Sequence, residues 1–289
     1  MAMELIDVHA HMADEGFVGD LDQVLESAAR VGVVAIITVV ENVAEGARLL
    51  DLAERYPILK PCAGLYPDIL DLKAAAEMEA FIRNHQDRLV GIGEVGLDHW
   101  VVKDEEQRRR QEEILARFVA LATELDLPLN VHSRSAGRHT IRLLQAHGAT
   151  RVLMHAFDGR ASTALEGIEA GFYFSIPPSI VRSQQKQKLL RHLPLERLLL
   201  ETDSPVLGPD RLVRNEPKNV LLSCQAVTQA KGVSVGEVAR VTTENARQLF
   251  PKAFALPARP HWEDRGERSS HGSAESLPQG DDGEAGVSA

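Results

Sequence analysis

Near the N-terminus the chain reads Ile6-Asp7-Val8-His9-Ala10-His11, and this stretch decides how the rest of the sequence is interpreted. Apolar residues lead into two histidines, which is typical of a short buried strand with polar groups at its end. Side chains at positions i and i+2 of a strand lie on the same side, so His9 and His11 are expected to point to one place. Two imidazoles held in this way suit a divalent metal ion. The pair by itself fits equally well two unrelated polar residues at a strand end, so other parts of the chain must decide.

Comparable apolar runs recur along the chain and alternate with longer amphipathic stretches. The strands are expected at residues 5–9, 33–40, 59–65, 90–94, 129–132, 152–155, 172–175 and 198–201. The helices are expected at residues 20–31, 42–55, 73–87, 104–126, 136–147, 161–170, 182–192, 216–231 and 234–250. Strands that alternate with helices in this way predict an α/β fold, the TIM (β/α)8 barrel. A doubly wound open sheet is the alternative, but its first strand would lead into a glycine-rich loop rather than into histidines.

Composition and charge limit the classes of protein to consider. A hydrophobic content of 44% is enough for a large buried core. The net charge of −10 argues against a general nucleic-acid binder, which is normally basic. No apolar run approaches the roughly 20 residues that span a bilayer. The N-terminus lacks the basic segment of a secretory signal, and the two cysteines form no pairing motif. We therefore expect an intracellular protein, cytoplasmic or nuclear or both, without a membrane partner.

The chain divides into two segments of different composition. Residues 1–254 carry the barrel pattern, whereas residues 255–289 are rich in Ser, Gly, Pro, Asp and Glu and contain few aliphatic residues. The second segment cannot bury enough apolar surface to order itself, so a flexible acidic tail is expected there.

Metal-ligand residues stand at the ends of five predicted strands, where the active site of a (β/α)8 barrel lies. They are His9, His11, Glu94, His132, His155 and Asp203. Each one alone has an ordinary explanation, such as a hydrogen-bonded core histidine or a helix N-cap. Four imidazoles and two carboxylates exceed what one tetrahedral ion with an open position requires. Together they predict two divalent ions bridged by Glu94, with Asp203 as a ligand that also accepts the proton of the nucleophilic water.

Five segments resemble motifs of the TatD family of metal-dependent deoxyribonucleases, which are amidohydrolase-like TIM barrels. They are 7–11, 93–98, 132–134, 155–159 and 201–205, with weaker similarity at 214–217 and 245–250. The resemblance spans roughly residues 4–250, leaves the tail outside, and is strongest to the animal TatD domain-containing proteins. Two departures stand beside the ligands: His155-Ala156-Phe157-Asp158-Gly159 replaces the commoner His-Cys-Phe-Ser-Gly, and His99-Trp100 replaces other aromatics. They bear on substrate preference more than on the chemistry.

The resemblance implies a hydrolase that cleaves DNA phosphodiester bonds. Carried over position by position, all six strand-end residues are metal ligands, and Asp203 and Glu94 are also catalytic. None of the six is missing, so an active enzyme is expected. Zinc, manganese and magnesium are the candidate metals, with two ions per chain.

Residues for contact with DNA are harder to assign. Cationic side chains follow strands five to eight at Arg134, Arg138, Arg160, Arg182, Arg214 and Lys218, and most of them are equally well explained as solvated loop charges. We expect phosphate contacts from Arg134, Arg160 and Arg214, and base stacking from Tyr66 and Trp100, which also fit lids over the site. No extended basic stripe exists, which favours exonuclease-like trimming of chain ends or single strands over cutting of long duplex.

Two other functions stay open at this point. One is an amidohydrolase-type metal hydrolase that acts on a small amide, lactone or phosphoester. The other is a non-catalytic scaffold that binds partners through its tail. The sequence specifies no oligomer, and a monomer is compatible with everything above.

Overall fold

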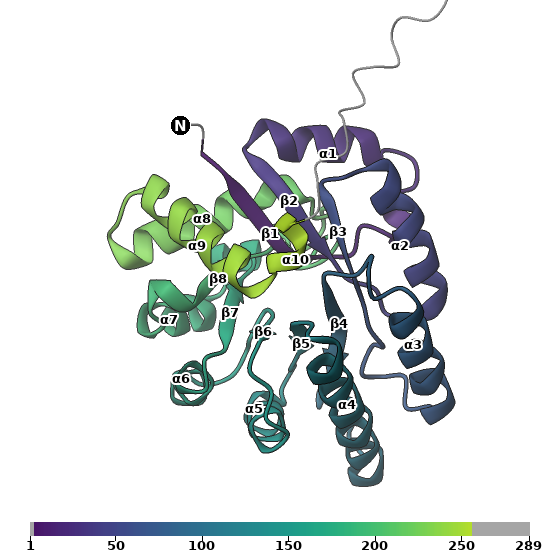
Figure 1. Ribbon diagram of the computed structural model, residues 1–289. Helices are drawn as coiled ribbons and strands as arrows, with labels where there is room; N and C mark the ends of the chain where they lie inside the picture. Colours follow the sequence, from purple (N-terminus) through teal and green to yellow (C-terminus); the bar gives the residue numbers. More distant parts are fainter. Residues whose placement is uncertain (1–2, 256–289) are drawn as a thin grey trace, which may run out of the picture. The chain divides into compact units, whose positions relative to one another are not determined.

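The computed structural model describes residues 3–255 and confirms the predicted (β/α)8 barrel (Figure 1). One eight-stranded parallel sheet has the order β1-β2-β3-β4-β5-β6-β7-β8. Its strands are β1 (Leu5–Ala10), β2 (Val33–Thr38), β3 (Leu59–Ala63), β4 (Gly91–Gly96), β5 (Leu129–His132), β6 (Val152–Met154), β7 (Tyr173–Ile176) and β8 (Leu198–Leu200). The predicted tail at 255–289 lies outside the described residues except for its first residue.

Helices surround the strands (Figure 1). They are α1 (Leu21–Arg30), α2 (Val43–Arg55), α3 (Leu72–Asn84), α4 (Glu105–Leu125), α5 (Gly137–Ala146), α6 (Ala161–Glu169), α7 (Gln184–His192), α8 (Val220–Lys231), α9 (Val235–Leu249) and α10 (Pro251–Ala255). Short 3-10 helices are η1 (Glu15–Phe17), η2 (Pro178–Arg182), η3 (Leu195–Arg197) and η4 (Pro217–Asn219). Every predicted helix is present; the one expected at 216–231 begins later, because η4 occupies its first residues. The short α10 was not predicted. No helix within residues 3–255 is long and apolar enough to cross a membrane.

Hydrogen bonds beyond the end of β8 join it to β1 and close the barrel. The Asp203 N–H donates to the His9 carbonyl at 2.8 Å, and the His11 N–H donates to the Ser204 carbonyl at 2.7 Å. The buried Asp7 carboxylate accepts from the Thr202 N–H at 2.9 Å. These bonds fix the segment that carries two histidines against the segment that carries Asp203.

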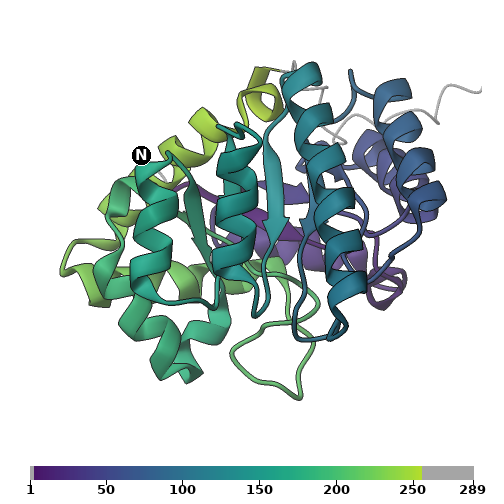
Figure 2. The same ribbon diagram turned by 90° about the horizontal axis from the view of Figure 1, so that it is seen from below.

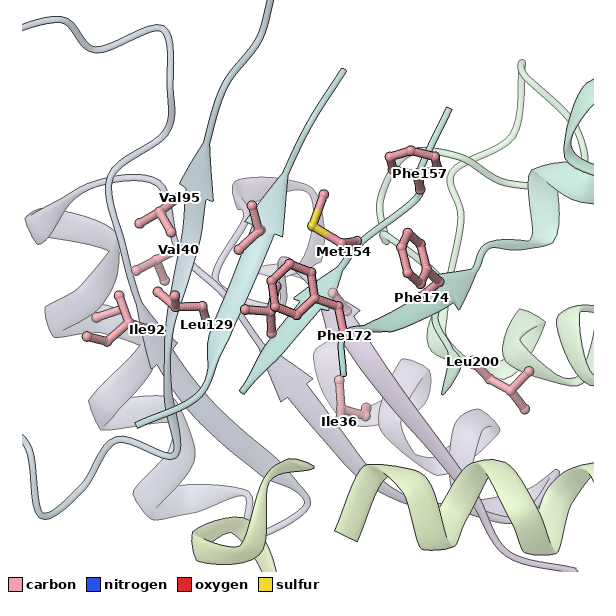
Figure 3. Packing of buried hydrophobic residues seen from close by; sticks show 14 of the residues in the cluster. Ile36, Val40, Ile92, Val95, Leu129, Met154, Phe157, Phe172, Phe174 and Leu200 are labelled. Carbon is pink, nitrogen blue, oxygen red and sulfur yellow. The ribbon is translucent and has the colours of Figure 1, made fainter. Parts of the chain in front are cut away.

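Two apolar clusters stabilise the barrel. The larger lies between strands and helices and includes Ile92, Phe172 and Phe174 (Figure 3). The smaller, which we call the inner cluster, joins alternate strand residues to the C-terminal helices. It consists of Ile6, Val8, Ala35, Ile37, Val39, Cys62, Val90, Leu153, Tyr173, Leu199, Ala246, Leu249, Phe250 and Ala253. The inner cluster thus lies toward the end of the barrel that α10 covers (Figure 2).

Two strands depart from regular alternation shortly before they end. The register of β1 shifts between Asp7 and Ala10, and that of β4 shifts between Ile92 and Val95. Ile92 and Val95 both belong to the larger cluster although three positions separate them. Such bulges re-aim the side chains within them, and here those are the side chains of His9 and Glu94.

Candidate metal centre

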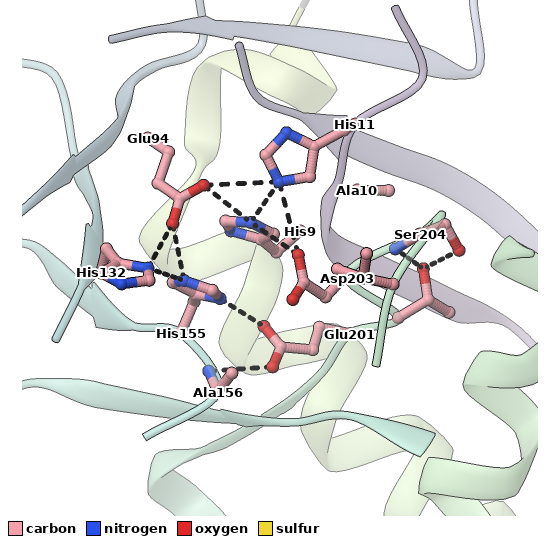
Figure 4. A network of polar contacts seen from close by, with 12 residues as sticks. His9, Ala10, His11, Glu94, His132, His155, Ala156, Glu201, Asp203 and Ser204 are labelled. Atoms are coloured by element: carbon pink, nitrogen blue, oxygen red, sulfur yellow. Dashed lines mark hydrogen bonds and ion pairs between the residues drawn. The ribbon is translucent and has the colours of Figure 1, made fainter. Parts of the chain in front are cut away.

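All six strand-end residues predicted as ligands meet at one end of the barrel (Figure 4). In the first group, His9 Nε2 lies 3.3 Å from His11 Nε2, and both nitrogens lie 3.4 Å from Asp203 Oδ1. Glu94 Oε2 lies 3.7 Å from His9 Nε2 and 3.4 Å from His11 Nε2. Four donor atoms from three strand ends therefore surround one position.

The chemistry of this group fits a cation. The Asn130 Oδ1 lies 2.8 Å from His9 Nδ1 and accepts a hydrogen bond from its N–H, so His9 Nε2 presents a lone pair toward His11 Nε2. The two ring nitrogens can lie this close only with a positive group between them, which is a proton of His11 in the metal-free chain and can be a divalent cation in its place. Zinc–nitrogen bonds of about 2.0–2.1 Å in a tetrahedron place ligand atoms about 3.3–3.4 Å apart. Four of the five separations given above match that spacing, and the distance of 3.7 Å from Glu94 Oε2 to His9 Nε2 is longer.

A second group uses the other oxygen of the same glutamate. Glu94 Oε1 lies 2.7 Å from His132 Nδ1 and 2.9 Å from His155 Nε2, and the two nitrogens are 3.2 Å apart. Three donors leave room for a further ligand, as in catalytic metal sites. Each oxygen of Glu94 therefore faces one of the two groups of donors.

Buried polar residues orient the histidines from behind. Asn130 also donates from Nδ2 to the Val8 carbonyl at 2.9 Å, which fixes its amide. Asp98 Oδ2 lies 3.1 Å from His132 Nε2. Glu201 accepts from the Ala156 N–H at 2.9 Å and lies 3.7 Å from His155 Nδ1. Partners of this kind set the tautomer and ring orientation of metal-binding histidines.

The backbone at Asp203 is unusual for a residue with a side chain. Its φ of 57° lies in the left-handed region, which costs free energy outside glycine. Hydrogen bonds on both sides hold it there, since its N–H donates to the His9 carbonyl and its carbonyl accepts from the Val206 N–H at 2.8 Å. Such strain, kept in place by its surroundings, is common at functional sites.

Electrostatic coupling ties the carboxylates and imidazoles together. Burial alone would raise the pKa of Glu94, but His155, His11 and His132 hold it well below its ordinary value. Burial opposes the charged form of His155 too, yet Glu94 and Glu201 raise its pKa to about 10. The pKa of His11 is likewise raised, by Asp203 and Glu94, against the effect of burial. Without metal these imidazoles therefore keep protons that a divalent ion would replace.

Of the predicted substrate contacts, Tyr66 lies against a residue of the centre, and Trp100 and Arg134 lie against each other. The Tyr66 ring lies 5.3 Å from the His132 ring, edge to face. Trp100 is exposed, and the guanidinium of Arg134 lies 5.2 Å from its ring centre, as does the Lys103 ammonium.

The other two predicted contacts are placed differently. Arg160 is exposed at the N-cap of α6. Arg214 binds Asp20 at 2.6 and 2.9 Å and Glu216 at 3.0 Å, and it packs over the Phe17 ring. Its charge is thus already neutralised, and the residue fastens the loop after β8 to the segment before α1.

Sequence reasoning assigned no role to several residues of the site. Asn130 stands two positions before His132, on the same side of β5, and that spacing was a usable signal. Asp98 and Glu201 stand within the family motifs but were given no role. Glu41 groups with His11 and Glu94 and had no signal in the sequence, because it reaches the site from the loop after β2.

Comparison with known proteins gives consistent matches over the barrel. The family model described as TatD related DNase matches residues 6–251. The human protein named Deoxyribonuclease TATDN3 is 49% identical over 263 residues, which are 86% of this chain and 95% of that protein. The Bacillus subtilis protein named Uncharacterized metal-dependent hydrolase YabD is 34% identical over 256 residues, 85% of this chain and 98% of that protein. The crystal structure of YJJV, a TatD homologue from Escherichia coli, superimposes with a TM-score of 0.81 at 28% identity, covering 87% of this chain and 99% of that one.

Proposed function

The chain belongs to the TatD related DNase family and is a metal-dependent hydrolase, and from this premise we propose that it cleaves DNA phosphodiester bonds with two divalent ions. The observation that carries the proposal is Glu94, whose two oxygens face two separate groups of donors. One ion would be held by His9, His11, Asp203 and Glu94, and the other by His132, His155 and Glu94. Nitrogen and oxygen donors in this mixture suit zinc or manganese, and magnesium is the third candidate.

Two divalent ions, when bound, offset the charge of a phosphodiester and lower the pKa of a water. Asp203 then supplies the proton acceptor. Burial would raise the pKa of its carboxyl, but His11 and His9 hold it well below the ordinary value. The group is therefore ionised at neutral pH and can accept a hydrogen bond from an attacking water. It would take up the proton of that water because bound divalent ions would make the water more acidic.

The surrounding residues position these groups. Asn130 keeps His9 in the tautomer that presents Nε2 to the centre. Asp98 contacts Nε2 of His132 and so keeps that ring in the tautomer that presents Nδ1 to the centre. Thr202 ties the start of the loop that carries Asp203 to Asp7, with its N–H on Asp7 Oδ1 at 2.9 Å. The ligands thus lie on rigid elements rather than on a free loop.

For the substrate we propose the end of a DNA strand or a short single strand. Trp100 and Tyr66 offer aromatic surface for bases, and Arg134, which lies against Trp100, offers a charge for phosphate. Arg160 is exposed and available for the same purpose. Arg214 would act by holding the loop after β8 in place. A monomer made of the 1–254 barrel and the 255–289 tail, working in the cytoplasm or nucleus, is part of the proposal.

The test is cleavage by the purified full chain. End-labelled single-stranded and duplex DNA are incubated with magnesium, manganese or zinc, in parallel with a small phosphodiester, an amide and a lactone. Asp203→Asn should lower the rate by about 10³-fold, within the range for loss of a general base that is also a ligand. Asp210→Asn, an exposed acid in the same loop, is the matched control and should keep the rate within twofold. Cleavage of only the small substrates would overturn the assignment to DNA, and equal rates in both variants would indicate a contaminant.

A further inference from the structure

Two cations follow β7 four residues apart, Arg182 at the end of η2 and Lys186 in the first turn of α7. They stand between the strand that leads to His155 and the strand that leads to Asp203. Within residues 3–255 neither one forms an ion pair with a carboxylate, in contrast to Arg214, which binds Asp20 at 2.6 Å. Two cations four residues apart, neither paired with a carboxylate among these residues, are available to bind an anion.

Lys186 is half-buried. With Phe157, Phe174 and Ser175 it lines a narrow cavity beside β7. The Ser175 hydroxyl on that wall donates to Glu201 Oε2 at 2.6 Å, and Glu201 stands behind His155. Burial lowers the pKa of Lys186 and Arg182 adds to this, whereas Glu201, Asp203 and Asp158 act in the opposite direction. The ammonium therefore lies in the field of the site carboxylates without being paired to one of them.

One hydrogen bond to a backbone carbonyl holds the Arg182 side chain in place. Its Nε donates to the Gly208 carbonyl at 3.1 Å, within the loop that starts at Asp203. The other guanidinium N–H groups have no protein acceptor among residues 3–255. An arginine fixed through Nε presents its remaining donors as a fork, which matches two oxygens of a phosphate.

We propose that Lys186 and Arg182 form a phosphate subsite, which binds the DNA phosphate next to the one that is cleaved. This inference rests on the proposed function. The cleaved phosphate would face the two donor groups around Glu94, whereas these cations follow β7, which lies between the strands that lead to His155 and Asp203. The neighbouring phosphate of the same DNA strand is the anion that would reach these cations. Lys186 supplies a point charge at short range, and Arg182 fixes the direction from which the strand enters.

Binding and cleavage are measured separately in the full chain. In an Asp203→Asn background, a short fluorescent single strand is titrated at several salt concentrations with magnesium present. Lys186→Met should weaken binding about tenfold and reduce the slope of log K against log salt by about 0.7, the value for one lost phosphate contact on a single strand. Lys188→Met is the matched control, because Lys188 is exposed on the same helix; it should leave both quantities unchanged. Lys186→Arg should restore most of the affinity.

In the cleaving enzyme, Lys186→Met should raise KM several-fold, with the metal content unchanged and kcat reduced less. Identical affinity and salt slope for Lys186→Met and Lys188→Met would overturn the subsite even if the wild-type chain cleaves DNA. Absence of cleavage by the wild type with every metal would instead overturn the proposed function. A strand that binds neither to the Asp203→Asn chain nor to the wild-type chain kept free of metal would overturn both.

Discussion

The two ends of the same eight strands differ completely in chemistry. At the end covered by α10, the inner cluster buries Val8, Ile37 and Phe250 among aliphatic neighbours. At the other end, one residue beyond Val8, His9 lies buried against Glu94 and Asp203. The first end contributes stability through burial of apolar surface, and the second concentrates ionisable groups whose burial has a desolvation cost. A barrel can hold such a site because the opposite end stabilises the fold.

The change from one chemistry to the other coincides with the bulges. In β1 the alternation is regular through Ile6 and Val8 and then shifts before Ala10. In β4 the shift lies between Ile92 and Val95, around Glu94. Each bulge turns one predicted ligand toward the other donor side chains, whereas strict alternation would turn it toward the helices. The comparison therefore predicts that activity and stability can be changed separately.

The largest effect is expected from His9→Ala with His11→Ala. The double change removes two donors of the first group and leaves the second group intact, so the metal content should fall to about half and turnover should fall by at least about 10³-fold. Metal analysis of the purified variant measures the metal content, and a DNA cleavage assay measures the turnover. Full metal occupancy of the variant would show that His9 and His11 do not bind metal. The chemical contrast between the two ends of the barrel would then be lost.

Acidification should have the next largest effect. The pKa of His155, raised to about 10, keeps the imidazole protonated at neutral pH without metal. A raised pKa stabilises the fold fully below the unfolded value of about 6.5, and this contribution is lost as the pH rises through about 10. A binding ion must displace that proton, so metal affinity should fall about tenfold per pH unit, or about 100-fold from pH 8 to pH 6, for each proton released. Calorimetric manganese titrations in buffers of different ionisation enthalpy measure the protons, and a pH-independent affinity would contradict the coupling.

Asn130→Ala should have an intermediate effect. It removes the acceptor of the His9 Nδ1 proton but no ligand, so metal affinity or activity should fall about 10–100-fold. Thermal unfolding of the metal-free variant separates this from a folding defect. An unchanged affinity would mean that the bulge in β1 alone sets the orientation of His9.

The smallest effect on activity is expected from Phe250→Ala. This fully buried ring belongs to the inner cluster, and its truncation should lower the free energy of unfolding by about 3–5 kcal/mol. Activity per folded molecule and metal content should stay within twofold of the wild type. A large loss of activity in the folded variant, measured well below its unfolding transition, would show that the two ends are coupled.

The sequence alone determined the architecture. Short β-branched runs at strand length, separated by stretches with a 3.6-residue period, specify alternation of strand and helix, and chain connectivity then favours a barrel. The spacing of ligand-type residues after those runs also placed His9, Glu94 and Asp203 at one end. Both are local patterns, which can be recognised in the sequence without knowledge of tertiary contacts.

Only the tertiary structure decided how those residues meet. Register shifts in β1 and β4 depend on pairing with neighbouring strands, so the periodicity of the sequence does not predict them. Arg214 is predicted to contact phosphate but binds Asp20, far away in the chain. Lys186 of α7 lines a cavity with Phe157, which follows β6. Such contacts join residues from distant parts of the chain. Their free energies depend on distance, burial and competing partners, which exist only after the chain has folded.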